Sequence, residues 1–194
     1  MRRLLALLLL LPVLALSACS GLGSTNTGGF ISGNGEVQTI PAKDRGNPLE
    51  LSGNTLDGRT FDLTSTRGKV TVLNVWGSWC GDCIDEAGEL QKAHQQLGSS
   101  VPFVGIDVRE TSPDQARAYV SNFGIDYPSI YSPDGQATLA FSSYVSPRTI
   151  PATLVLDRTG RPVVIIRGTI PDGLALVETV RCVENPKRPH CEGY

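Results

Sequence analysis

Two cysteines with two residues between them are the feature of this sequence best suited to chemistry. Cys80 and Cys83 belong to the segment WGSWCGDC, residues 76–83, which follows an apolar, β-branched run at 70–76 and opens a helical pattern at 80–97. A thiol at a helix start faces free backbone N–H groups and the positive end of the helix dipole, and both stabilise the thiolate that attacks disulfides. One helical turn brings Cys83 back to Cys80. We therefore expect Cys80 to be the attacking thiol and Cys83 the more buried, resolving thiol.

Two other uses of this cysteine pair stay open: a static disulfide and half of a zinc site. A zinc site would need two further His or Cys ligands, and the candidates are His94, His190, Cys182 and Cys191. Cys182 and Cys191 lack the short spacing usual for zinc ligands, and His94 falls on the apolar stripe of the predicted helix, where a packed histidine is expected. We accordingly expect no metal and no other cofactor.

Two neighbours of the cysteines are expected to tune the site. Trp79 should shield it and offer an apolar surface for docking a client protein. Asp82 lies between the cysteines, and a carboxylate beside a thiolate disfavours the thiolate. This effect opposes the helix start and favours a reductant over an oxidant. The alternative is that Asp82 is solvated and has little influence.

The N-terminal residues predict export. Residues 1–18 combine a short basic start, an almost unbroken apolar run at 4–16 and a small-residue ending, which is the pattern of a secretory signal peptide. Residues 16–19, LSAC, resemble a bacterial lipobox, in which the cysteine is lipidated, so Cys19 would anchor the protein to the extracytoplasmic face of a bacterial membrane. An ordinary signal peptide whose end happens to hold a cysteine is the alternative. Residues 19–44, rich in Gly, Ser, Thr and Asn, predict a flexible tether behind the anchor.

The last two cysteines lie near the C-terminus. With Cys19 lipidated, four of the five cysteines remain, and an even number in an exported chain indicates two intramolecular pairs. We expect Cys182 and Cys191 to form a structural disulfide that pins a tail at 182–194. The alternative is a second redox pair that relays electrons.

Apolar periodicity predicts one α/β domain at 45–181. A turn signal at 54–58 between short strand patterns predicts an N-terminal β-hairpin extension. Further strands are predicted at 70–76, 101–108, 127–131, 152–156 and 163–167, and helices at 80–97, 113–123, 136–144 and 171–180. The last two strands are joined by so short a turn that they must be antiparallel. The expected fold is therefore a central mixed sheet flanked by helices.

The motif at 76–83 and the segment TIPAT at 149–153 together resemble the thioredoxin fold. The resemblance is narrower to its TlpA/ResA-like branch, which includes cytochrome-maturation thioredoxins, and it covers residues 47–180. It implies that Pro151 is a cis proline packed opposite the cysteines and that the backbone of Ile150 pairs with the substrate; a trans proline that starts an edge strand is the alternative. It also implies that Glu86, three residues after Cys83, helps to move protons or raises a thiol pKa; an exposed helix carboxylate without such a role is the alternative. The branch often has proline at the position of Gly88, so the expected helix kink is in doubt.

These features predict an extracytoplasmic thiol–disulfide oxidoreductase that exchanges electrons with exported proteins. Asp82 and the family branch favour a reductant of the cytochrome c maturation type, supplied by a membrane dithiol donor. A disulfide-forming oxidant, coupled to a membrane acceptor, is the alternative, and a binding module without turnover is another. A thiol peroxidase fits less well, because peroxiredoxins have Thr three residues before the attacking Cys and this chain has Gly77. The net charge of −2 and the lack of a basic block do not support nucleic-acid binding.

Overall fold

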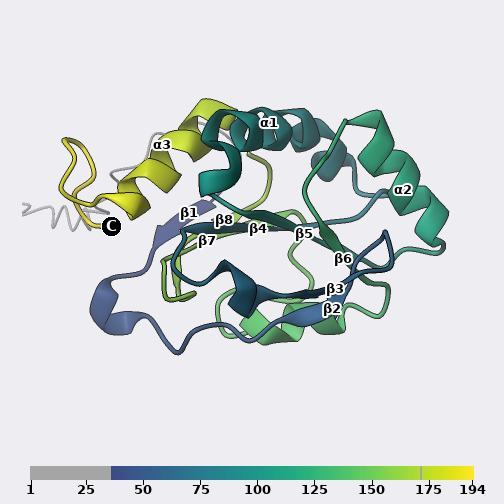
Figure 1. Ribbon diagram of the computed structural model, residues 1–194, viewed down its shortest axis with the longest axis horizontal. Coiled ribbons are helices and arrows are strands. Elements are labelled where there is room, and N and C mark those ends of the chain that lie inside the picture. Colours follow the sequence, from purple (N-terminus) through teal and green to yellow (C-terminus); the bar gives the residue numbers. More distant parts are fainter. Residues whose placement is uncertain (1–35, 171) are drawn as a thin grey trace, which may run out of the picture.

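A six-stranded mixed sheet forms the centre of the molecule (Figure 1). The structure is a computed structural model that describes residues 36–170 and 172–194, so the predicted signal peptide, Cys19 and most of the predicted tether lie outside the described residues. The strand order is β1-β8-β7-β4-β5-β6. The strands span Glu36–Thr39 (β1), Thr71–Trp76 (β4), Phe103–Val108 (β5), Ser129–Ser132 (β6), Ala152–Leu156 (β7) and Pro162–Arg167 (β8). Strands β4, β5 and β6 are parallel, whereas β1, β8, β7 and β4 pair antiparallel.

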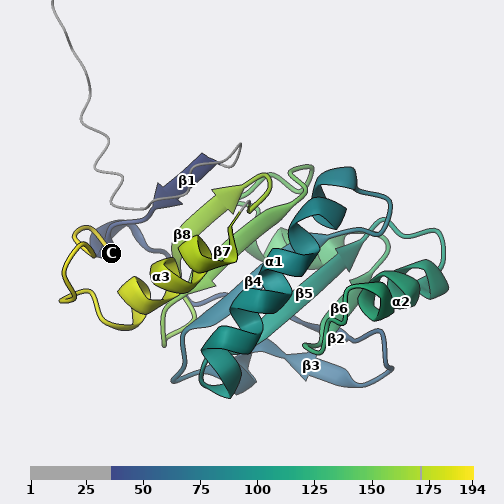
Figure 2. The same cartoon turned by 90° about the horizontal axis from the view of Figure 1, so that it is seen from above.

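Three α-helices lie on one face of this sheet and a small hairpin lies on the other (Figures 1 and 2). The helices are α1 (Gly81–Leu97), α2 (Pro113–Asn122) and α3 (Gly173–Glu184). The opposite face carries a two-stranded sheet of β2 (Ser52–Asn54) and β3 (Thr60–Asp62), together with the 3₁₀ helix η4 (Gln136–Phe141). Three further 3₁₀ turns complete the described elements: η1 (Ala42–Asp44), η2 (Leu63–Thr66) and η3 (Gly98–Ser100). No described helix has the length and apolar character needed to span a bilayer.

Each face of the sheet packs its own hydrophobic core. Every residue of β4 is buried, and its side chains alternate between the faces because successive strand residues point in opposite directions. Val72 and Trp76 join the core beneath the helices, and Leu73 and Val75 join the core beneath the hairpin. Asn74 follows the same alternation and therefore faces the helices. The expected fold class, a central mixed sheet with helices and an N-terminal hairpin, is confirmed.

The ordered structure begins earlier than the tether predicted at 19–44. Strand β1 pairs with β8, with Glu36 opposite Arg167. Arg167 forms an ion pair with Glu36 at 3.6 Å and donates a hydrogen bond to the side chain of Gln38, while Val37 packs against the core. The tether interpretation therefore does not hold for residues 36–39. The alternation of exposed and partly buried residues in β1 covers only four residues, which is too short to predict a strand without its partner β8.

The last helix is longer than predicted. The sequence interpretation ended it at residue 180, but α3 runs to Glu184, so Cys182 lies in its last turn and not in a separate tail. The apolar stripe continues because Val180 and Val183 are both buried. The segment predicted as a helix at 136–144 is the shorter 3₁₀ helix η4.

Candidate redox site

The two cysteines of the motif lie at the connection between β4 and α1 and in the first turn of α1. Cys80 is the N-cap residue of α1, and it is joined to Cys83 by a disulfide with a Cα–Cα distance of 5.2 Å. The backbone N–H of Cys83 donates a hydrogen bond to Sγ of Cys80 at 3.2 Å. The exposed fraction is 7% for Cys80 and 0% for Cys83. Cys80 is thus the less buried of the two cysteines, and its sulfur faces a backbone donor that stabilises negative charge.

A cis proline stands beside this turn. The Ile150–Pro151 peptide bond is cis, as the resemblance implies. Strand β7 pairs antiparallel with β4, with Ala152 opposite Val75, so Pro151 lies next to Trp76, where β4 leads into the cysteine loop. Ile150 is partly buried and touches both hydrophobic cores. Its pairing with a client backbone stays a prediction.

Glu86 is held inside the molecule, one helical turn beyond Cys83. Its side chain is fully buried, and its carboxylate accepts hydrogen bonds from Nδ2 of Asn74 at 2.9 Å and from the backbone N–H of Ile170 at 2.8 Å. Burial raises the pKa of Glu86 to about 7, although the two hydrogen bonds act in the opposite direction. A carboxyl with this pKa can take up or release a proton near neutral pH.

Two residues that sequence reasoning did not single out complete the surroundings of the site. Asn74 donates both to Glu86 and to Oγ1 of Thr153 at 3.1 Å; its signal was a lone polar residue in the apolar run at 70–76. Tyr119, on α2, donates from its hydroxyl to the carbonyl of Cys83 at 2.7 Å and stacks on Trp76 with a centroid distance of 4.3 Å. Nothing local in the sequence marks Tyr119, because the contact joins two separate helices.

Two large apolar side chains lie exposed near the cysteines. Trp79 is 51% exposed and Ile84 is 42% exposed. The indole N–H of Trp79 donates to the carbonyl of Val108 at 3.2 Å, which holds the ring over the end of β5. Asp82 is exposed, and its effect on the thiolate stays a prediction.

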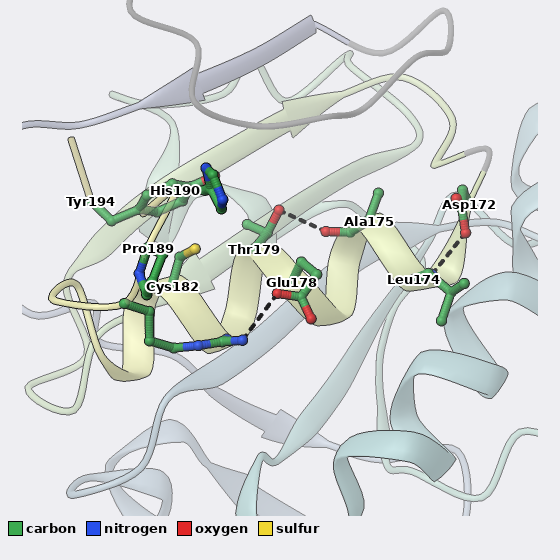
Figure 3. Close-up of a pocket in the computed structure, with 10 residues that line it drawn as sticks. Asp172, Leu174, Ala175, Glu178, Thr179, Cys182, Pro189, His190 and Tyr194 are labelled. Carbon is green, nitrogen blue, oxygen red and sulfur yellow. Dashed lines mark hydrogen bonds and ion pairs between the residues drawn. The ribbon is translucent and has the colours of Figure 1, made fainter. Parts of the chain in front are cut away.

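The second cysteine pair lies at the end of α3. Cys182 and Cys191 form a disulfide with a Cα–Cα distance of 5.0 Å, and both are buried. Cys182 lines a pocket of about 520 Å³ between α3 and the C-terminal residues, which Figure 3 shows with Thr179 and His190 along it. Neither Cys80 nor its loop lines this pocket. The surroundings of this pair are therefore separate from those of Cys80 and Cys83.

The two histidines have separate environments. His94 contacts the rings of Phe103 and Tyr127, and its Nε2 lies 3.2 Å from a carboxylate oxygen of Asp126. His190 lines the pocket on α3. Within residues 36–170 and 172–194, no group of three or more His, Cys, Asp or Glu side chains is arranged to hold a metal ion.

A disulfide at the mouth of a helix, beside a cis proline and on a mixed sheet of this order, defines the class of thioredoxin-fold proteins. Residues 45–163 match the model of the AhpC/TSA family, and the chain belongs to this family. The resemblance to the TlpA/ResA-like branch is confirmed by its relatives. The chain is 32% identical over 118 residues to the thiol-disulfide oxidoreductase ResA of Geobacillus thermodenitrificans, covering 59% of this chain and 64% of that protein. It is 27% identical to ResA of Bacillus subtilis over 61% of this chain and 64% of that protein.

Solved structures agree with this placement. A DsbF homologue from Corynebacterium diphtheriae is 32% identical, with a TM-score of 0.67, over 73% of this chain and 90% of that chain. A secreted thiol-disulfide isomerase from Corynebacterium glutamicum is 29% identical, with a TM-score of 0.69, over 77% of this chain and 92% of that chain. The chain spans slightly less than two thirds of the length of the ResA proteins that it matches.

Proposed function

We propose that the protein is an extracytoplasmic thiol–disulfide oxidoreductase that reduces disulfides of exported proteins through Cys80 and Cys83. The observation that carries the proposal is the disulfide at the N-cap of α1, close to the cis peptide bond at Ile150–Pro151, with Cys80 less buried than Cys83. Among the residues that the structure describes, the disulfide between Cys182 and Cys191 has no helix start and no cis proline beside it.

The reaction follows from this geometry. In the reduced protein, the Cys80 thiolate attacks a client disulfide, forms a mixed disulfide and releases one client thiolate. Cys83 then loses its proton and attacks Sγ of Cys80, which releases the second client thiolate and leaves the Cys80–Cys83 disulfide. The client gains two electrons and the protein loses two. Glu86, one turn beyond Cys83 and with a pKa of about 7, is the group that takes the proton of Cys83. A membrane dithiol donor would restore the reduced pair.

The charges near the cysteines favour the reducing direction. Asp82 and Asp85 are exposed carboxylates within two residues of Cys83, and within the described ranges of the chain neither forms an ion pair with a Lys or Arg. Nearby negative charge disfavours the thiolate, and a less stable thiolate makes the dithiol form a better electron donor. A client of the kind implied by the family branch is an apocytochrome c whose haem-binding cysteines have become oxidised.

Client docking would use the exposed surface beside Cys80. Trp79 and Ile84 supply apolar contact area, and the backbone at Ile150, before the cis proline, offers hydrogen-bonding groups to an extended client segment. Addition of a short strand in this way gives affinity without demanding one client sequence.

The membrane attachment forms part of the proposal. Cys19 is proposed to carry lipid, with residues 20–35 as a tether between it and β1. Export is supported by similarity to a soluble secreted antigen of Mycobacterium bovis and to the secreted isomerase of Corynebacterium glutamicum. Replacement of Cys19 by Ala should move the protein from the membrane fraction to the soluble exported fraction, and mass spectrometry of the wild-type N-terminal peptide should show a lipid adduct.

The surroundings of Gly77 argue against a peroxidase. A Cβ at this position would lie 2.6 Å from Nε1 of Trp79 and 3.1 Å from the carbonyl oxygen of Val108. The threonine that peroxiredoxins place three residues before the attacking cysteine therefore has no room while Trp79 is packed as it is.

Insulin reduction and a potential measurement test the proposal together. The wild-type protein should reduce insulin with dithiothreitol as electron donor, Cys80→Ser should not, and Cys182→Ser with Cys191→Ser should retain the activity. Equilibration with redox buffers should give a potential near that of thioredoxin, about −270 mV. A potential near about −120 mV would reject the reducing direction and establish the oxidant, and a pair that never exchanges would reject the enzyme.

A further inference from the structure

Asp107 carries a carboxyl group that is fully buried and that receives no hydrogen bond. It lies on β5, opposite Trp76 in the parallel register with β4, and the alternation of the strand places it on the face covered by the helices. Its exposed fraction is 0%, and neither carboxyl oxygen has a donor among the described residues. A buried acceptor without a donor costs free energy, so this group requires an explanation.

The neighbour of Asp107 is Glu110, which is bound to the loop that carries Cys80. Glu110 accepts hydrogen bonds from the backbone N–H of Ser78 at 2.5 Å and from Oγ of Ser78 at 2.9 Å. Ser78 lies two residues before Cys80. The adjacent hydrogen bond from Trp79 to Val108 attaches the same loop to the same end of β5. Through these two hydrogen bonds Glu110 holds the segment that leads into the attacking cysteine.

The two acids lie within hydrogen-bonding reach of each other, and two carboxylates have only acceptors to offer. A hydrogen bond between them therefore requires one proton. Both oxygens of Glu110 already accept from Ser78, as a carboxylate does. Asp107 has no other donor, so the proton belongs on Asp107, which then donates to Glu110. Burial, with the charge of Glu110 in addition, raises the pKa of Asp107 to about 8.

The groups that face this pair do not supply an alternative proton or a compensating charge. These groups are Ser78 from the loop, Trp76 from β4 and Tyr119 from α2. A negative charge on Asp107 contributes to the raised pKa of the Tyr119 phenol, after burial and the charge of Glu86. Burial raises the pKa of Tyr119 above its ordinary value, so it stays neutral. In the described part of the chain, no Lys or Arg forms an ion pair with Asp107 or Glu110.

We propose that Asp107 and Glu110 share one proton and act together as positioning residues that hold the Ser78 loop, and thereby Cys80, in its reactive arrangement. With the proton present, the pair carries a single negative charge and both hydrogen bonds from Ser78 to Glu110 are formed. When the proton leaves, two adjacent buried carboxylates repel each other, and the hydrogen bonds from Glu110 to Ser78 weaken. Exchange at Cys80 is therefore sensitive to the protonation of a group that does not touch the sulfurs. The role rests on the proposed function only in that Cys80 is the attacking thiol.

Infrared spectroscopy of the oxidised, purified protein tests the shared proton directly, because the disulfide-bonded cysteines do not titrate. The carboxylic-acid carbonyl absorption should contain a component that disappears with a midpoint near pH 8, beside the component of Glu86 near pH 7. Asp107→Asn should remove the component at pH 8, whereas Glu86→Gln, which removes the other buried acid, should retain it. In Glu110→Gln the component of Asp107 should titrate at a lower pH, since the negative neighbour is gone; this variant answers the question if Asp107→Asn does not fold. Absence of a band that depends on Asp107 overturns the proposal.

A kinetic comparison tests the positioning role. The rate at which dithiothreitol reduces Cys80–Cys83 is measured against pH for the wild type and for Asp107→Asn, whose neutral amide can donate to Glu110 at every pH. The ratio of the two rates cancels the ionisation of the reagent. The ratio of the wild-type rate to the rate of Asp107→Asn should be constant below pH 7 and should fall about tenfold with a midpoint near pH 8. A tenfold change is the effect expected of one hydrogen bond to a charged group. A ratio that is flat to pH 9.5 refutes the coupling.

Insulin reduction by the same preparations separates this inference from the proposed function. A protein that reduces insulin but shows neither the band nor the change in ratio refutes the shared proton and leaves the enzyme intact. A protein that shows both and never reduces insulin supports the pair and refutes the oxidoreductase.

Discussion

Replacement of the buried Glu86 by Gln should change how the stability of the protein depends on pH. The carboxyl of Glu86 is fully buried, and its pKa is raised from 4.5 to about 7, chiefly by burial. In the unfolded chain the group ionises near its ordinary pKa, whereas in the folded protein it resists ionisation. As pH rises from about 4.5 towards 7, the unfolded state therefore gains stability that the folded state does not, and the free energy of unfolding falls.

The size of the effect follows from the pKa difference. One pKa unit corresponds to about 1.4 kcal/mol, so ionisation of Glu86 above pH 7 costs the folded protein about 3 kcal/mol relative to a residue that does not titrate. Part of this cost already applies at pH 5, and the change between pH 5 and pH 8 is about 2.5 kcal/mol. Glu86→Gln removes this change. Asp107, with its pKa also raised, contributes its own fall in both proteins and therefore cancels in the comparison.

Denaturant unfolding of the oxidised proteins measures the difference. The free energy of unfolding of the wild type should fall by about 2.5 kcal/mol more than that of Glu86→Gln between pH 5 and pH 8. The matched control is Glu89→Gln on the same helix. Glu89 has a lowered pKa, because Lys92 and the backbone N–H of Gly173 donate to its carboxylate. Its contribution is complete above its ordinary pKa and is lost only on acidification, so this variant should follow the wild type.

Equal pH dependence in the wild type and in Glu86→Gln would refute the reasoning. It would mean that Glu86 titrates alike in the folded and unfolded states, and hence that water reaches a carboxyl that the structure places in the interior. The proposed transfer of the Cys83 proton to Glu86 would then lose its physical basis, since an ordinary surface carboxyl is ionised and weakly basic at neutral pH.

Two further predictions concern the loop and the tail. Gly77→Thr should abolish insulin reduction and lower the free energy of unfolding by about 1–3 kcal/mol, because the new side chain collides with Trp79. The control is Gly81→Ala, which should fold normally because a Cβ there meets nothing within 4 Å. Equal loss of stability in both variants would contradict this account. Removal of the disulfide between Cys182 and Cys191 by a double Ser substitution should lower the free energy of unfolding by about 2–4 kcal/mol while insulin reduction persists; loss of reduction in a folded double variant would instead indicate an electron relay.

The parts of the site that could be predicted are local in the chain. The cysteine pair, the strand before it and the helix after it form one continuous segment, and their residue types follow from helix capping and from the burial of a β-branched run. The prediction ends α3 four residues early and assigns β1 to the tether, because each of these elements depends on a partner. Val183 continues an apolar stripe only if the core extends beneath it, and β1 becomes a strand by pairing with β8.

The groups that sequence reasoning did not find are those that meet across elements. Asn74 reaches Glu86 from β4, and Tyr119 reaches the carbonyl of Cys83 from α2. Glu110 binds Ser78 across 32 residues of sequence. Each of these side chains has an ordinary surface or turn role in most proteins, and no spacing rule distinguishes the present one.

The position of two cysteines at the start of a helix can be predicted from neighbouring residues alone, because the apolar run and the helical pattern on either side are local. Which carboxylates are removed from water, and which donors they meet, depends on how distant elements pack together. Burial is a property of the whole packed core, and the pKa values of Glu86 and Asp107 depend on it. The chemistry of the sulfurs was therefore visible in the chain, whereas the means of handling their protons appeared only when β4, β5, α1 and α2 came together.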